Sequence, residues 1–423
     1  MSQRSSTRNA ERGTRDLIRP LLRWFSRHAR DLPWRRRRDP YAVWISEIML
    51  QQTQVKTVVP YWKRWMRELP DVRSLASAPD QRVLKLWEGL GYYSRVRNAQ
   101  RAAAQIVDRH GGEFPRRFED VLALPGVGRY TAGAISSIAF DEPRPILDGN
   151  VIRVLTRLFG IGGDPHGKKT NARLWRLAEE LVTRAGSSRC SAFNQALMEL
   201  GALVCTPRAP RCGACPLRRN CNASRTGRAG ELPRLARRAV VTERRVIAFV
   251  VERKGKFLVR QRLGGVVNAQ LWEFPNIEAP LVDGATPGEL LREHLGLRVR
   301  ALQPLGRINH SITRYRIRLE AYRVVPSRRD ARLLGRDCWL SLAELDALPF
   351  TSAHRKVLEM LGRGATTHAE SLPRSFAAES ARGPAQSRTL REKGSAPSAR
   401  QRSGLRQPSA AFSQASHRQD ASL

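Results

Sequence analysis

The chain has 423 residues, enough for two or three domains that each bury a core of their own. Lysine and arginine number 75 against 38 aspartates and glutamates, and the net charge of +37 indicates a polyanionic partner, with nucleic acid as the first candidate. No run of about 18 apolar residues is present, which argues against a membrane-spanning helix. The N-terminal segment lacks the apolar stretch of a secretory signal, so we expect a cytoplasmic protein, associated with the nucleoid if its source is bacterial.

Apolar residues recur at three- and four-residue steps from Asp16 to about Cys221, which predicts a largely helical first region. In the segment VWISEIMLQQTQ the apolar residues form one predicted helix face and leave Glu47, Gln51 and Gln54 along another. By its spacing alone, this polar stripe is typical of a solvated helix surface. A chemical role for Glu47 therefore needs further support.

Two later segments place polar groups where helices begin. LPGVGRYTAGAIS, residues 124–136, has two glycines in a turn before a helix, and the backbone N–H groups of such a turn can hold a phosphate oxygen. In ILDGNVIRVLTRLFG, residues 146–160, Asp148 directly precedes a helix. Taken alone, the first segment equally suits an ordinary connection between helices, and Asp148 equally suits a plain N-cap.

Four of the six cysteines lie in one short, basic, proline-containing loop, which indicates metal ligation in a reducing compartment rather than a disulfide scaffold. Their spacing is C-x6-C-x2-C-x5-C, at Cys205, Cys212, Cys215 and Cys221. Four thiolates suit either a [4Fe–4S] cluster or a tetrahedral zinc ion, and the number of ligands does not choose between them. Cys190 and Cys338 stand alone and are interpreted as ordinary buried cysteines.

The sequence pattern changes beyond the cysteine loop. A basic segment without periodicity, residues 224–238, predicts an interdomain linker. Two β-branched runs around a Lys-Gly turn in residues 244–262 predict a β-hairpin, and residues 288–295 and 315–325 predict a helix and a further strand of an α+β domain. The Ser-, Arg-, Ala- and Gln-rich end of the chain is predicted to be disordered.

The segments SEIMLQQTQ, GVGRYTAG and LDGNV and the cysteine spacing together resemble the adenine DNA glycosylase (MutY) family of helix–hairpin–helix iron–sulfur glycosylases. The resemblance implies removal of adenine mispaired with 8-oxoguanine or guanine, and a [4Fe–4S] cluster on the four cysteines. It also implies that Glu47 is the general acid that protonates adenine and that Asp148 faces the cationic sugar, with Tyr130 orienting it and Asn150 beside it. Tyr130 stands where related lyases have a lysine, so we expect hydrolysis without strand cleavage.

The same resemblance assigns residues to DNA binding. Because adenine inside a duplex cannot reach the carboxylates, it must be extruded and the gap filled. The residues matching those inserted around the lesion pair are Gln51, Gln52 and Tyr92, and those of the hairpin that holds the DNA backbone are Leu124, Gly126, Val127 and Gly128.

The second domain resembles the Nudix-like domain with which this family recognises 8-oxoguanine, and LWEFP, residues 271–275, is its landmark. The stretch ELLREHLGL lacks the acidic pair with which Nudix hydrolases bind magnesium, so we expect no pyrophosphohydrolase activity. HSITR places Ile312, Thr313 and Arg314 where the family's recognition loop has Phe-Ser-His, although the segment also suits an ordinary turn at a sheet edge. Arg314 thus replaces a histidine, a departure that concerns the discrimination of oxidised from normal guanine.

We therefore predict a multidomain protein with a mostly α helix–hairpin–helix glycosylase region, a [4Fe–4S] loop and an α+β Nudix-like domain. The predicted parts are a disordered N-terminus (1–15), the catalytic region (16–223), a linker (224–243), the Nudix-like domain (244–362) and a disordered basic tail (363–423). The expected partner is duplex DNA with adenine opposite 8-oxoguanine or guanine, with no membrane, and we expect a monomer. Two alternatives stay open: a thymine or pyrimidine mismatch glycosylase of the same superfamily, and a non-catalytic iron–sulfur DNA-binding protein.

Overall fold

The computed structural model describes residues 17–235, 241–281, 285–312, 314–326 and 337–367. The N-terminal segment predicted to be disordered, 1–15, and most of the predicted tail, from 368 onward, lie outside these ranges. Within them, no helix is both long enough and apolar enough to cross a membrane.

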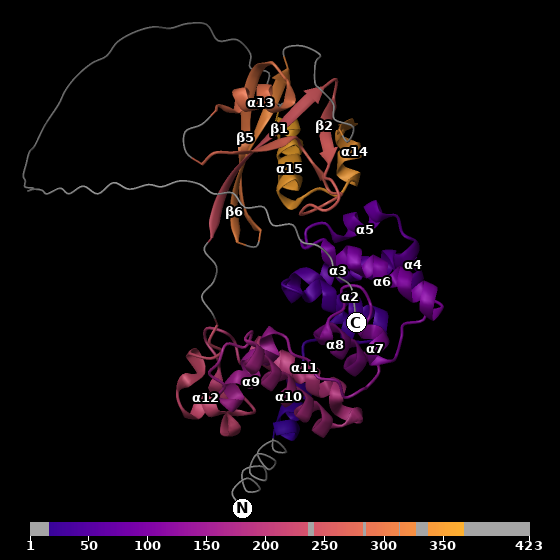
Figure 1. The fold of residues 1–423 in the computed structure, drawn as a ribbon, viewed down its shortest axis with the longest axis vertical. Helices are drawn as coiled ribbons and strands as arrows, with labels where there is room; N and C mark the ends of the chain where they lie inside the picture. Colours follow the sequence, from indigo (N-terminus) through magenta and orange to yellow (C-terminus); the bar gives the residue numbers. More distant parts are fainter. Residues whose placement is uncertain (1–16, 236–240, 282–284, 313, 327–336, 368–423) are drawn as a thin grey trace, which may run out of the picture. The chain divides into compact units, whose positions relative to one another are not determined.

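The first part of the chain is built almost entirely from helices, as predicted (Figure 1). After a helix over residues 17–28 and the short 3-10 helix η1 (Pro33–Arg35), the helices are α2 (Pro40–Leu50), α3 (Val55–Glu68), α4 (Val72–Ser77), α5 (Asp80–Trp87), α6 (Ser94–His110), α7 (Phe118–Leu122), α8 (Arg129–Ala139), α9 (Gly149–Phe159), α10 (Lys168–Ala185) and α11 (Ser187–Leu203). One apolar cluster joins them, and its largest fully buried side chains include Trp44, Trp65 and Trp87. This shared core holds the segments that carry the predicted site residues.

Short capping signals fix where α2 begins and where α9 begins and ends. Helix α2 has Pro40 at its first turn, and the Asp39 side chain accepts a hydrogen bond from Tyr41 N at 3.1 Å. Helix α9 begins after Asp148 and ends at Gly160, whose φ of 64° is the left-handed conformation that glycine adopts without strain. These caps set the first residue of α2, the helix that carries Glu47, and the first residue of α9, which follows Asp148.

The polar stripe predicted along one helix is wrong beyond Glu47. Helix α2 ends at Leu50, and residues 51–54 form a turn in which Gln52 has φ of 58°. The physical reason is a tertiary cap: the Arg95 guanidinium donates to Ile48 O at 2.7 Å and to Gln51 O at 2.6 Å, which satisfies carbonyl groups at the end of α2. A periodicity pattern carries no information about such a distant donor.

The predicted linker is also more ordered at its start than its sequence indicates. The 3-10 helices η2 (Cys212–Ala214) and η3 (Arg218–Asn220) are followed by α12 (Asn222–Arg225) and η4 (Arg228–Gly230). Leu232 is buried, and its carbonyl accepts a hydrogen bond from Arg157 Nε at 2.9 Å. Residues 236–240 lie outside the described ranges.

The second part of the chain is a mixed sheet with helices, as predicted for an α+β domain (Figure 1). Its elements are β1 (Thr242–Arg253), β2 (Lys256–Gln261), β3 (Trp272–Glu273), β4 (Asn276–Ala279), α13 (Pro287–Leu295), β5 (Val299–Ile312), β6 (Tyr315–Pro326), β7 (Asp337–Ser341), α14 (Leu342–Ala347) and α15 (Ser352–Thr367). The strand order is β3-β2-β1-β6-β5, with β4 also paired to β1 and β7 to β2. Strands β1 and β6 are parallel, and the other pairs are antiparallel. Helix α15 continues five residues past the predicted domain end at 362.

Strand β1 lies in the middle of the sheet, and its side chains alternate between two apolar cores. Ala248 and Val250 pack in the cluster that contains residues of α15, whereas Ile247 and Phe249 pack in the cluster that contains residues of α13. The sheet is therefore covered by helices on both faces. The predicted hairpin is confirmed: Glu252 pairs with Phe257, and the turn between β1 and β2 is the Lys-Gly step.

Candidate active site

A cavity of about 960 Å³ opens among η1, the end of α2, the turn after it, the start of α9 and α11. Pockets of this size hold small organic groups. Its walls include six of the predicted site residues: Glu47, Gln51, Gln52, Tyr130, Asp148 and Asn150. Among the described residues, Tyr92 and the four hairpin residues are not part of these walls. Gly126 lines a smaller cavity of about 180 Å³, whose wall also includes Gln51.

Glu47 is a buried acid, with 5% of its surface exposed. Burial raises its pKa to about 7, and nearby Asp148 raises it too, whereas the hydrogen bond from Tyr130 and the charge of Arg35 oppose the shift. Tyr130 Oη donates to Glu47 Oε2 at 2.5 Å. An acid with a pKa near 7 can deliver a proton at neutral pH.

The prediction that Tyr130 orients Asp148 is not what the structure shows, because the Tyr130 hydroxyl donates to Glu47 instead. The oxygens of Asp148 already have donors. Oδ1 accepts from Val151 N at 2.8 Å, and Oδ2 accepts from Asn150 Nδ2 at 2.8 Å. Asp148 is therefore an N-cap and a site residue at once. Burial raises its pKa, and these N–H donors oppose the shift.

Asn150 is itself oriented by the neighbouring helices. Arg153 Nη2 donates to Asn150 Oδ1 and to Gly201 O, both at 2.8 Å, which turns the amide nitrogen of Asn150 toward Asp148. A Cβ at position 201 would lie 2.6 Å from Asn150 Cβ, so only glycine allows α11 to approach this closely. The chain of contacts from α11 through Arg153 and Asn150 holds the Asp148 carboxylate in place.

Sequence reasoning missed a charged cluster on the cavity wall. Glu199 on α11 is paired with Arg30 at 2.8 Å and with Arg35 at 2.9 Å. Although burial alone would raise the pKa of Glu199, the hydrogen bonds from the two arginines lower it to about 2. Glu199 is thus an anion in the cavity wall, unlike Glu47. No local pattern reveals this cluster, because 164 and 169 residues separate Glu199 from its partners.

Two exposed turns carry the residues predicted to enter DNA. Gln52, with φ of 58°, lies after α2, and Tyr92, with φ of 46° and 47% exposure, lies before α6. Arg95 joins the turns, because its guanidinium donates to Gln51 O at 2.6 Å and to Gly91 O at 3.1 Å. Left-handed backbone at such residues costs about 1–3 kcal/mol and persists only where the surroundings impose it. The hydrogen bonds of Arg95 therefore hold together the two turns that carry Gln52 and Tyr92.

The predicted hairpin lies between α7 and α8. Leu124 and Val127 are buried, with 2% and 7% of their surfaces exposed, so their side chains anchor the turn rather than face solvent. Gly126 has φ of 77° and packs on Asn98, where a Cβ would lie 2.6 Å from Asn98 Cβ. Gly128 is the N-cap of α8 and supplies no side-chain cap. A phosphate contact by these four residues would therefore use their backbone N–H groups.

The four clustered cysteines follow α11. Burial raises the pKa of the Cys215 thiol to about 11, and the other three thiols lie near enough to raise it as well. The buried guanidinium of Arg157 donates to Cys205 Sγ at 3.3 Å and to Thr206 O at 2.7 Å. Within the described residues, no group of three or more His, Cys, Asp or Glu side chains could hold a single metal ion. A [4Fe–4S] cluster differs from a single ion in taking one thiolate on each iron, and the four thiols match that donor set.

The predicted recognition loop is the tip of the β5–β6 hairpin. Ile312 ends β5 and pairs with Tyr315, and Thr313 lies outside the described residues. Arg314 is exposed, and its Nη2 donates to Tyr315 Oη at 3.1 Å. The described part of the segment thus lies at the end of two paired strands, with the Arg314 side chain exposed.

Two family models define the class of this protein. Residues 45–180 match the HhH-GPD superfamily base excision DNA repair protein, and residues 246–360 match the NUDIX domain. The chain is therefore a helix–hairpin–helix DNA glycosylase with a Nudix-like domain after its catalytic region.

Curated relatives narrow the assignment. The adenine DNA glycosylase of Rattus norvegicus is 39% identical over 360 residues, which cover 72% of this chain and 69% of the rat protein. The adenine DNA glycosylase of Mus musculus is 37% identical over 397 residues, which cover 80% of this chain and 76% of the mouse protein. A solved thermostable thymine-DNA glycosylase aligns at 29% identity with a TM-score of 0.47, over 51% of this chain and 99% of its own. The chain belongs to the adenine DNA glycosylase family and is a hydrolase that acts on N-glycosyl bonds.

Proposed function

We propose that this base excision repair enzyme acts as a monomer on duplex DNA and removes adenine that is mispaired with 8-oxoguanine or guanine. Glu47 is the general acid, and Asp148 is the carboxylate that faces the sugar. The observation that carries the proposal is the buried Glu47, whose pKa of about 7 suits proton transfer and which shares one cavity with Asp148. Two carboxyl groups in different environments are what cleavage through an oxocarbenium-like state requires.

In the reaction, the protonated Glu47 transfers its proton to N7 of the extruded adenine. The C1′–N9 bond then breaks, its electron pair leaves with the base, and adenine departs neutral. Positive charge develops on the sugar, where Asp148 stabilises or captures it until water adds at C1′ and gives its proton to the Glu47 carboxylate. Tyr130 Oη, 2.5 Å from Glu47 Oε2, donates to the carboxylate that the proton transfer leaves behind. Tyr130 therefore acts on the general acid Glu47, and it also occupies the position at which related lyases have a lysine.

Extrusion of adenine costs about a few kcal/mol of lost stacking, which side chains inserted into the gap offset. The exposed turns with Gln52 and Tyr92 suit this role, since Arg95 braces both of them. The backbone N–H groups of residues 126–128, before α8, suit contact with a phosphate. Opposite the adenine, Ile312 and Arg314 at the β5–β6 hairpin suit recognition of 8-oxoguanine, together with Thr313 in the sequence.

The opposing base tests this part of the proposal. Single-turnover rates should be measured on otherwise identical duplexes with adenine opposite 8-oxoguanine, guanine, cytosine or thymine. We expect the first rate to be highest, the second to be measurable, and the others to be at background. Equal rates opposite 8-oxoguanine and thymine would overturn the proposed specificity without affecting the assignment to the family.

The pH dependence of excision follows from Glu47. Because the acid must be protonated and its pKa is about 7, the single-turnover rate constant is expected to fall as the pH rises through 7, about tenfold per unit well above it. Since the hydrogen bond from Tyr130 lowers the pKa of Glu47, Tyr130→Phe should move this decline to higher pH. A rate constant that stays flat from pH 6 to about pH 9 would contradict the assignment.

We further propose that Cys205, Cys212, Cys215 and Cys221 hold a [4Fe–4S] cluster. The support is their spacing, their proximity and the family to which the chain belongs. Bound there, the cluster would supply a rigid cross-link that shapes the loop. The same loop carries exposed arginines, among them Arg208 and Arg219, which suit contact with phosphates.

Purified protein is therefore expected to be brown, with about four irons per chain and no stoichiometric zinc. Cys212→Ser should lose iron and visible absorbance and should lower DNA affinity by about tenfold or more, because the displayed arginines lose their arrangement. Cys338→Ser, in β7, is the matched control and should keep the iron. A colourless, fully active protein with one zinc per chain would contradict the cluster.

A further inference from the structure

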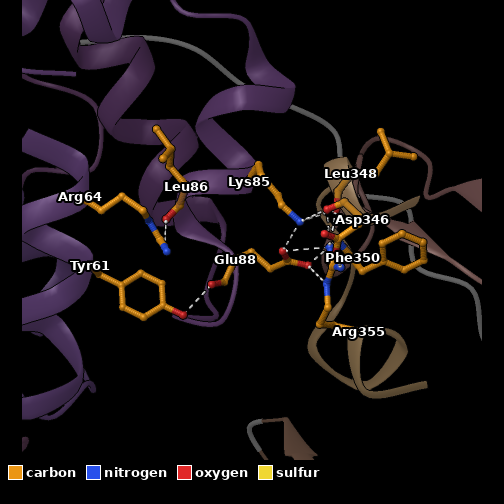
Figure 2. Close-up of polar contacts among 9 residues, drawn as sticks. All are labelled: Tyr61, Arg64, Lys85, Leu86, Glu88, Asp346, Leu348, Phe350 and Arg355. Atoms are coloured by element: carbon orange, nitrogen blue, oxygen red, sulfur yellow. Dashed lines mark hydrogen bonds and ion pairs between the residues drawn. The ribbon is translucent and has the colours of Figure 1, made fainter. Parts of the chain in front are cut away.

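Glu88, directly after α5, contacts the Nudix-like domain with both carboxylate oxygens (Figure 2). Oε1 accepts from Phe350 N at 2.9 Å and from Arg355 Nε at 2.8 Å. Oε2 accepts from Arg355 Nη2 at 3.1 Å and lies 2.8 Å from Lys85 Nζ. The Glu88 and Arg355 side chains are only 13% and 16% exposed. This is a sheltered, bidentate ion pair, which is stronger and more specific in geometry than an exposed one.

Further contacts surround the pair. Lys85 Nζ also donates to Leu348 O at 3.1 Å, and Trp272 Nε1 donates to Gln81 Oε1 at 3.1 Å. Leu271 is fully buried, and it packs in the apolar cluster whose other buried members all come from the catalytic region. Glu88 is thus part of a larger contact with polar and apolar members, and it is not an isolated surface ion pair.

On its other side, Glu88 begins the turn that carries Tyr92. Its carbonyl accepts a hydrogen bond from Tyr61 Oη at 2.8 Å (Figure 2). Trp87 Nε1 donates to Gly91 O at 3.0 Å, which closes the turn. Only three residues separate Glu88 from Tyr92, and the backbone between them is fixed at both ends.

We propose that Glu88 is a positioning residue that couples the Nudix-like domain to the Tyr92 turn, and that this coupling increases the preference for adenine opposite 8-oxoguanine over adenine opposite guanine. The inference rests on the proposed function, since it presumes that the Nudix-like domain senses the opposing base. When that domain engages 8-oxoguanine, Arg355 and Phe350 N hold Glu88 and thereby the turn from which Tyr92 enters the helix. Opposite guanine, the domain is less firmly engaged, and the turn has less support.

The test compares full-length variants in single-turnover excision on the two mispairs, with the ratio of the two rates as the readout. Glu88→Gln keeps the shape and an acceptor for Phe350 N but removes the charge that Lys85 and Arg355 contact. The matched control is Glu252→Gln, which removes an ion pair with Arg323 that lies wholly within the Nudix-like sheet. Arg355→Lys is a milder variant that keeps the charge and loses the bidentate geometry.

We expect the ratio to fall about 2- to 30-fold in Glu88→Gln, to fall less in Arg355→Lys, and to stay at the wild-type value in Glu252→Gln. The double variant with both Glu88→Gln and Arg355→Lys should not lower the ratio further than Glu88→Gln alone. A general loss of folding would lower both rates and leave the ratio unchanged, so it cannot imitate the expected result. If the wild type discriminates and Glu88→Gln discriminates equally well, the coupling is wrong and the proposed function stands. If the wild type does not discriminate, the proposed specificity and the coupling fail together.

Discussion

Glu47→Gln is expected to lower the single-turnover rate of adenine release by about 100- to 10,000-fold, the usual cost of removing a general acid. Glutamine has nearly the same shape, and its carbonyl can still accept the hydrogen bond from Tyr130. It has no proton to give at neutral pH. Binding to the mispaired duplex should remain close to wild type, because Glu47 is buried in the cavity wall and does not lie on the exposed turns that carry Gln52 and Tyr92.

Thermal unfolding separates this chemical effect from misfolding. Because the pKa of Glu47 is raised to about 7 in the folded state, against an ordinary value of 4.5, the folded wild type loses stability as the pH rises between these values. At pH 8 it carries a buried carboxylate that the variant lacks, so Glu47→Gln should unfold at an equal or higher temperature. Glu68→Gln, at the C-terminal end of α3 and outside the cavity wall, is the matched control and should keep full activity. A Glu47→Gln rate within about threefold of wild type would remove Glu47 from the mechanism.

Asp148→Asn is expected to lower the rate of adenine release by about 100- to 1,000-fold, a cost typical of losing one stabilising group at a developing charge. Asparagine is itself a good N-cap, and its carbonyl can accept from Val151 N as Asp148 does. The start of α9 should therefore persist while the negative charge facing the sugar is lost. The decrease in rate then reports the charge and not the helix.

A second N-cap provides the comparison. Asp39 accepts from Tyr41 N at the start of α2, as Asp148 accepts from Val151 N at the start of α9, but Asp39 is not part of the cavity wall. Asp39→Asn should thus leave the rate near wild type. Equal losses in Asp39→Asn and Asp148→Asn would mean that Asp148 acts only through the helix.

Much of the fold could be predicted from the sequence because its signals are local. The helical periodicity, the Lys-Gly turn before β2 and the alternation in β6 each depend on a few neighbouring residues, and each is confirmed. The end of α2 could not be predicted in this way, since Arg95 provides the cap from 44 and 47 residues along the chain. The order in the predicted linker has the same origin, because a buried guanidinium on α9 binds the Leu232 carbonyl.

The candidate site, like the fold, could be predicted from the sequence only where the signal is local. Glu47 and Asp148 were located from motifs, and the structure brings both into one cavity. The sequence did not predict all of their partners. The Tyr130 hydroxyl donates a hydrogen bond to Glu47, and no local sequence pattern indicated Glu199 or its two arginines. Burial raises the pKa of Glu47, whereas at Glu199 the hydrogen bonds from Arg30 and Arg35 outweigh burial and lower the pKa; both effects depend on the packed fold.

The most direct test of the central claim follows the released base and the DNA strand separately in one reaction. Excess full-length protein is mixed with a duplex that carries one adenine opposite 8-oxoguanine, and each time point is divided between chromatography of free bases and electrophoresis with and without alkali. We predict free adenine at a rate that matches strand breakage after alkali, with an intact strand when alkali is omitted, because no lysine occupies position 130. Absence of free adenine, or breakage of the untreated strand as fast as adenine is released, would contradict adenine hydrolysis without strand cleavage.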